Sequence, residues 1–242
     1  MGGRALNAAS AAWDPTKPAG LQQQAPLTAE YQAVFEANLA NRALGGQDYN
    51  PAVSCFPAGM PRVMIAYDPL EIIVTPDVTY IRSDHLAEIR RIYTDGRDWP
   101  QSITPTFAGY SIGSWVGDEG RYEALEVETR GTKGPRVLDL NGLPLHRDNQ
   151  TIVKERIFLD QADRNLLHDE ITLVDHAYTQ PWTVTRDYRR EVNPIWVENS
   201  CWDDNHDILL GRESYFLSAD GYLMPTKRDQ PGPDLRNFGF HQ

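Results

Sequence analysis

Most of the chain alternates between apolar and polar residues in short runs, a pattern that predicts β-strands. The runs are separated by turn-forming pairs such as Pro76-Asp77, Asp95-Gly96 and Asp220-Gly221, which suit tight hairpins. No helical pattern intervenes, so successive strands are expected to form an antiparallel meander, whose closure into a barrel would remove its exposed edges. The strands are expected near 63–67, 70–75, 78–84, 87–94, 106–115, 122–129, 151–159, 166–174, 182–191, 195–201 and 213–217.

One amphipathic helix is predicted ahead of these strands, in the stretch PLTAEYQAVFEANLANRALGG. Thr28 is a suitable N-cap and Gly45 a suitable stop, which gives a helix over about 28–44. Its apolar stripe, which includes Tyr31 and Phe35, is expected to dock on the core.

The predicted organisation is a single β-barrel domain over residues 27–242, with its strands between about 63 and 217. Residues 1–26 are short of apolar positions and are expected to form a flexible arm. Residues 218–242 are predicted to form an extended strap. A barrel of about eight or more strands leaves room for one small ligand.

Composition and charge narrow the classes of partner. With 40% hydrophobic residues and a net charge of -11, the chain is typical of a soluble acidic protein. Such a charge repels phosphate backbones and anionic lipid, so nucleic acid is not expected as a partner. No run of about 18 apolar residues predicts membrane insertion, and a homodimer stays open. The N-terminal stretch shows no leader and favours the cytoplasm, although a removed secretory signal would leave the same start in the periplasm.

The two cysteines, Cys55 and Cys201, are too few for a zinc cluster and lack CxxC spacing. A disulfide in an oxidising compartment and two buried thiols both remain open.

Charged residues inside one expected strand are the first candidates for a functional site. The stretch TIVKERIFL, residues 151–159, places Glu155 on a face shared with apolar side chains. A buried Glu is costly unless it is paired, and the abundant partners are Arg90, Arg91 and Arg156. A cross-strand pair of Arg91 with Glu155 is the structural interpretation. In a cavity lined by aromatic rings, the same Glu would have a raised pKa and act as a base.

A catalytic set is predicted around this position. Arg91 and Tyr93 share one strand face, where a guanidinium and a phenol can stabilise developing negative charge. His85 or His176 would move the proton, because histidine exchanges protons near neutral pH. Glu155 would orient Arg91 or itself act as the base.

The predicted substrate-binding residues are mainly aromatic side chains from several strands, a composition that suits a flat, partly apolar ligand. They are Phe107, Tyr110, Trp115, Arg156, Asp175, Trp182 and Tyr215. No phosphate loop or dinucleotide fingerprint is present, so no cofactor is expected. The histidines lack HxH or HExxH spacing, so no metal site is predicted either.

The stretch GYSIG, residues 109–113, matches the GxSxG pattern of serine hydrolases. That motif requires a helix after the serine, and none is predicted here. Gly109 and Gly113 are better explained by a bent strand or by a ligand that lies close to the backbone.

Several motifs carry a resemblance to known families. With YTDGR, GYSIGSW, EVETRG and DHAYTQPW in this order, the chain resembles a large, poorly characterised family of β-rich bacterial proteins, many of them exported. The segment from Gly109 through Trp115 to Gly117 also resembles the glycine-tryptophan turn of calycin-type, lipocalin-like barrels, although Val116 stands where an acidic residue is usual. This second resemblance implies a cavity for an apolar molecule.

The leading functional hypothesis is a cofactor-independent lyase or isomerase. It would bind a hydroxylated aromatic or steroid-like molecule and catalyse elimination, decarboxylation or isomerisation by proton transfer. The alternative is a calycin-like carrier or sensor that binds an apolar small molecule without catalysis. A structural envelope protein with a filled barrel is the third hypothesis.

Overall fold

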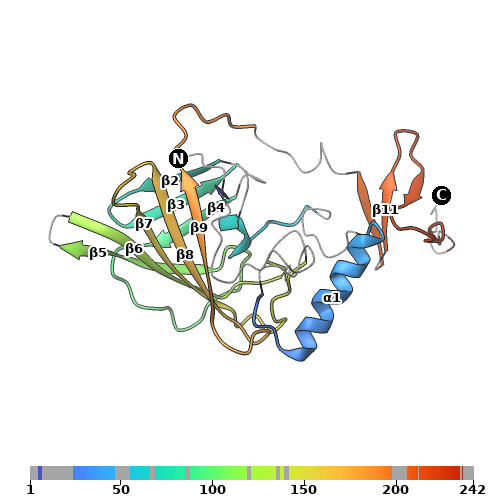
Figure 1. Ribbon diagram of the computed structural model, residues 1–242, viewed down its shortest axis with the longest axis horizontal. Helices are drawn as coiled ribbons and strands as arrows, with labels where there is room; N and C mark the ends of the chain where they lie inside the picture. The colour runs from blue at the N-terminus through green and yellow to red at the C-terminus, as the bar shows by residue number, and fades with distance from the viewer. Residues whose placement is uncertain are drawn as a thin grey trace.

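The computed structural model describes a mainly β protein, as predicted (Figure 1). It consists of a large curled sheet that forms a half-barrel, one α-helix and a separate three-stranded sheet. The described residues are 5–6, 24–46, 55–65, 69–84, 88–118, 121–134, 137–138, 142–197, 206–211, 213–234 and 236.

The large sheet has the strand order β1-β9-β8-β7-β6-β5-β4-β3-β2. Its strands are β1 (Ala5–Leu6), β2 (Leu70–Val74), β3 (Val78–Ser83), β4 (Ile89–Tyr93), β5 (Tyr110–Asp118), β6 (Arg121–Arg130), β7 (Ile152–Leu159), β8 (Leu166–Val174) and β9 (Trp182–Arg189). Neighbours are antiparallel except β4 and β5, which pair in parallel. The predicted meander is therefore wrong at this point, because the long connection over 94–109 returns the chain to the same end of the sheet.

Within the described strands, β1 and β2 stand at opposite edges of the large sheet. The short β1 lies in the predicted flexible arm, yet it pairs with β9 through Ala5–Tyr188 and Leu6–Asp187. The half-barrel supports the general barrel prediction, and its closure as a calycin barrel stays a prediction.

The inner face of the sheet carries the core and is covered by chain segments from outside the sheet. Met60, Val63 and Met64 pack there, from a segment that includes the 3-10 helix η2 (Arg62–Ile65). The expected strand over 63–67 is therefore wrong where the structure describes it, since a short apolar run buried on all sides suits either conformation. Leu138, Leu143 and Leu145 complete the covering.

The helix α1 (Ala29–Ala43) confirms the predicted helix and its ends. Thr28 caps it by accepting the amide hydrogen of Tyr31 at 3.4 Å. Gly45 follows the helix with a φ of +96°, a conformation that favours glycine. Tyr31 and Phe35 are the buried residues of its apolar stripe.

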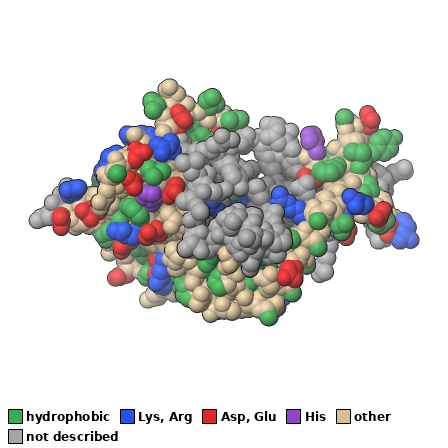
Figure 2. Space-filling model, viewed as in Figure 1, with side chains coloured by type: hydrophobic (Ala, Val, Ile, Leu, Met, Phe, Trp, Pro, Cys, Tyr) green, Lys and Arg blue, Asp and Glu red, His purple; other side chains and the backbone are tan. Residues whose placement is uncertain are grey.

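The second sheet lies beside the C-terminal end of α1 (Figure 1). Its strands are β10 (Asp207–Leu210), β11 (Glu213–Leu217) and β12 (Leu223–Pro225). β12 belongs to the predicted strap, so at least three of its residues form a strand. The amide of Arg228 donates to the carbonyl of Leu44 at 2.9 Å and ties this sheet to the helix. Figure 2 shows hydrophobic side chains gathered over it, and Tyr222 and Met224 are among those exposed.

Three further predictions can be compared with single features of the structure. Cys55 is disulfide-bonded; the chain's other cysteine, Cys201, lies outside the described residues. No helix in the described ranges is long and apolar enough to cross a membrane. Of the strand expected over 195–201, residues 195–197 are described and are not in a strand.

Candidate functional site

An ion pair on the inner face of the large sheet joins Arg90 of β4 to Glu155 of β7. The two side chains are 1% and 0% exposed. Nη1 of Arg90 donates to Oε1 of Glu155 at 2.7 Å, and Nη2 donates to Oε2. Nη2 also donates to the Thr129 hydroxyl at 2.8 Å, which in turn is 2.7 Å from the Ser111 hydroxyl. The pair is therefore bidentate and further satisfied by two hydroxyls.

This geometry confirms that Glu155 is buried in an ion pair, but it corrects the predicted partner. Glu155 is buried and paired, but its partner is Arg90 and not Arg91. Side chains alternate along β4, so Arg90 points to the inner face and Arg91 to the outer one. Ser111, the central residue of GYSIG, is buried in the same network.

A second buried acid, Asp169 of β8, lies near this pair. It is 0% exposed, and both of its carboxylate oxygens lack a hydrogen-bond partner among the described atoms. Burial, helped by the negative charge of Glu155, raises the pKa of Asp169 well above its usual range, against the lowering influence of Arg90 and Arg186. The protonated form, which can donate a hydrogen bond, is therefore favoured.

Tyr188 of β9 supplies another hydroxyl to the same interior. Its hydroxyl donates to the carbonyl of Met64 in η2. Burial raises the pKa of Tyr188 well above its usual range. A void of about 10 Å³, enough for one water molecule, lies between the sheet and η2; it is lined by Met64, Leu70, Ile72, Ile157, Leu167 and Tyr188.

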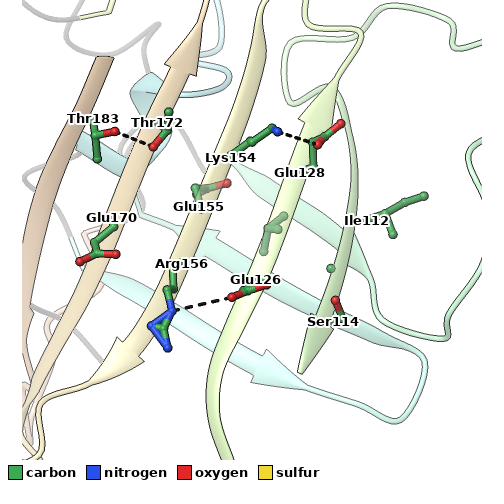
Figure 3. Close-up of a pocket in the computed structure, with 12 residues that line it drawn as sticks. Ile112, Ser114, Glu126, Glu128, Lys154, Glu155, Arg156, Glu170, Thr172 and Thr183 are labelled. Carbon is green, nitrogen blue, oxygen red and sulfur yellow. Dashed lines mark hydrogen bonds and ion pairs between the residues drawn. The ribbon is translucent and has the colours of Figure 1, made fainter. Parts of the chain in front are cut away.

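The outer face of β5 to β9 holds a shallow groove of about 380 Å³ (Figure 3). Lys154 lies 3.8 Å from Glu128, and Arg156 lies 3.8 Å from Glu126. These pairs are largely exposed and therefore add little to stability. Arg156, predicted to bind substrate, lies in this groove, on the other face of the sheet from the Arg90–Glu155 pair.

The predicted catalytic residues that the structure describes lie in three places. Arg91 and Tyr93 are on the outer face of β4, where hydrogen bonds first to Tyr93 and then to Tyr80 raise the pKa of Arg91. Glu155 is on the inner face, and His176 follows β8 in a loop with 64% of its side chain exposed. His85 lies outside the described residues. The structure therefore does not bring these four described side chains together.

Three of the predicted substrate-binding aromatics lie in β5 or in the loop before it, and they do not share one face. Tyr110 packs against Tyr93 with ring centres 5.0 Å apart. Phe107 lies in the preceding loop, 6.0 Å from the ring of Phe56. Trp115 is half-buried and packs against the core.

The remaining predicted binding residues are farther apart in the fold. Trp182 of β9 belongs to the core, whereas Tyr215 is buried in β11 of the separate sheet. Asp175 follows β8 and is buried, where it accepts hydrogen bonds from the backbone and from Thr151. Neither the outer groove nor the small void is lined by any of these three side chains.

A cluster of two histidines and one aspartate, which the sequence analysis did not predict, forms beyond the ends of β7 and β8. The ligand atoms of His146, Asp148 and His176 all lie within 4.8 Å of one another. Burial works to raise the pKa of Asp148, but hydrogen bonds from His176, His146 and the Gln150 amide lower it to about 2. This carboxylate is therefore ionised and held between two imidazoles.

A different pairing surrounds His168 of β8. Its Nδ1 is 2.7 Å from Oδ1 of Asp187, and its Nε2 is 3.1 Å from Oδ2 of Asp160. Burial lowers the pKa of His168, but these two carboxylates outweigh it, and the pKa is raised above the usual value.

Comparisons of the chain with protein-family models, with curated proteins and with solved structures find no match. The arguments about function therefore rest on the geometry above.

Proposed function

We propose that the protein is an enzyme that binds a hydroxylated aromatic or steroid-like small molecule in its half-barrel and catalyses proton transfer without a cofactor. The observation that carries this proposal is Asp169, a fully buried carboxyl group with both oxygens unpartnered. A buried polar group without a partner costs free energy, so such a group is characteristic of a site that meets a ligand.

Asp169 would act as the proton donor in this chemistry. A carboxyl group kept protonated by burial can donate to a carbonyl oxygen as negative charge develops on it. Tyr188 would supply a second donor, after releasing the carbonyl of Met64. The Arg90–Glu155 pair would set the electrostatic environment of Asp169 and help to position its side chain. The role of carrying the proton, predicted for His85 or His176, is assigned here to His85.

A ligand would reach Asp169 by displacing the part of η2 that closes the small void. Met64 forms one wall of that void and accepts the Tyr188 hydroxyl, so movement of one segment would both enlarge the space and free the phenol. Closure of the curled sheet into a calycin-type barrel, as its glycine-tryptophan segment implies, would complete the cavity.

The test is an assay of binding and turnover in the same samples. Purified protein is incubated with a panel of hydroxylated aromatic and steroid-like compounds, and thermal shift and mass-resolved products are measured. Asp169→Asn should retain binding and lower turnover at least about hundredfold, the usual contribution of a general acid. Tyr93→Phe, on the outer face, is the matched control and should leave turnover unchanged. Turnover that survives Asp169→Asn would contradict the proposal.

A non-catalytic carrier or sensor of an apolar molecule is the second candidate function. The observation that favours it is the Arg90–Glu155 pair, whose charges are already satisfied by each other and by two hydroxyls. Stabilisation by a compound of the panel, without any product from pH 5 to about 9, would favour this carrier over the enzyme.

A further inference from the structure

We propose that His146, Asp148 and His176 form a binding site for a divalent transition-metal ion, of the class that includes Zn²⁺ and Fe²⁺. Two imidazoles and one carboxylate are a ligand set that these ions prefer. The site is separate from the proposed acid Asp169. Asp169 lies six residues before Asp175, the neighbour of His176 in the sequence, and a strand of that length spans about 20 Å.

The spacing of the ligand atoms fits this proposal. Nδ1 of His146 lies 2.9 Å from Oδ2 of Asp148, and Nδ1 of His176 lies 2.6 Å from the same oxygen. Ligands about 2.1 Å from one tetrahedral ion stand about 3.4 Å apart. Both nitrogens are slightly closer than this to Asp148, so an outward movement of less than about 1 Å by the histidine rings would admit a shared ion.

The surrounding residues hold the ligands in place. Asp175, which is buried, accepts the amide hydrogen of His146 at 2.8 Å and the hydroxyl of Thr151 at 2.5 Å. The ring of Tyr31, from α1, packs 5.2 Å from the ring of His146. Such outer partners orient metal ligands and preserve the geometry of the site.

Among the described residues the site has three protein ligands, and one of its sides is open. The side chain of His176 is 64% exposed, compared with 27% for His146. A bound ion would therefore keep coordination positions for water or for an anionic ligand, which is the arrangement of sites that act as Lewis acids.

The test uses the full-length protein, prepared without a histidine tag and dialysed against a chelator. Zn²⁺ binding is measured by calorimetry and Co²⁺ binding by visible absorption, both without reference to turnover. The expected result is one ion per chain, with affinity lowered at least about tenfold by His176→Gln and by Asp148→Asn. His206→Gln, which removes an exposed histidine of the small sheet region, should leave affinity unchanged.

Three outcomes would overturn the proposal. They are the absence of stoichiometric binding to the wild-type chain, wild-type affinity in His176→Gln, and an equal loss in His206→Gln. Because His176 is exposed, its variant is expected to fold and keeps the test decisive if Asp148→Asn unfolds.

Discussion

Arg90 and Glu155 meet face to face inside the half-barrel, although β5 and β6 separate their strands in the sheet. The curl of the sheet brings them within bidentate contact, and Thr129 of β6 and Ser111 of β5 each accept a further hydrogen bond from the guanidinium. The attraction of such a pair offsets its desolvation only while both partners are present.

Removing one partner of this pair should be strongly destabilising. Arg90→Met or Glu155→Met leaves an uncompensated buried charge and is expected to lower the free energy of unfolding by about 3–5 kcal/mol. The double variant removes both charges and should recover most of that loss. Urea denaturation of the three variants checks this expectation.

Arg156→Met is the matched control for this series. Arg156 has a Glu partner on the neighbouring strand, but its side chain is 43% exposed, so the loss should stay below about 1 kcal/mol. A cost for Arg90→Met no larger than this one would show that the buried pair is energetically unimportant.

The strands were predictable from the sequence where one face of the strand is buried and the other is exposed to solvent. β8 begins and ends at the predicted residues, and buried positions alternate along it. β11 also has the predicted bounds, although Ser214 and Tyr215 are both buried and its burial does not alternate. The 3-10 helix at 62–65 was not predictable in this way, since Val63 and Met64 are both buried and give no alternation. The parallel pairing of β4 with β5 depends on a tertiary crossover that local pattern does not contain.

Parts of the candidate site were visible in the sequence, but their partners were not. Alternation places Asp169 on the apolar face with Ile171, a signal that the sequence analysis did not develop. The burial of Glu155 was expected. Its pairing with Arg90 depends on which residues of the distant strand β4 point inward, and the sequence around Glu155 does not contain that information. His146 and Asp148 are close in sequence, but only the end of β8 brings His176 to them.

Asp169 should make the protein less stable as pH rises. Its folded pKa is raised, so above the unfolded value of about 3.9 the folded state keeps a proton that the unfolded state releases. The free energy of unfolding should therefore fall from about pH 4 upward until the folded pKa is passed, by at most about 1.4 kcal/mol per pH unit. Asp169→Asn should reduce this slope in denaturation curves measured across the range. Parallel curves for wild type and variant would contradict the assignment.

His168 should add a separate loss of stability at higher pH. Its folded pKa is raised, so the ion pairs with Asp187 and Asp160 contribute fully below the unfolded value of about 6.5 and are lost as pH rises through the folded pKa. His168→Gln should therefore flatten the stability curve from about pH 6 upward, while leaving the slope near pH 4 that depends on Asp169. Direct titration of the imidazole by NMR would check the pKa, and an ordinary or lowered value would refute this account.

Gly113 tests what the glycines of GYSIG do. A Cβ at this position would lie 2.8 Å from Cγ2 of Ile92 and 3.1 Å from the carbonyl oxygen of Glu126. Gly113→Ala should therefore lower the free energy of unfolding by about 1–3 kcal/mol, because the inner packing around β4 and β5 leaves no room for it. Gly232→Ala, which has open space around it, should change stability by less than about 0.5 kcal/mol.

The size of this effect decides between the two explanations of the glycine. A clear loss of stability in Gly113→Ala, without a matching change in ligand binding, would assign Gly113 to the close approach of Ile92. Unchanged stability with loss of binding to a compound of the panel would instead mean that a ligand lies against this backbone, since a methyl group there would then block the ligand and not the fold.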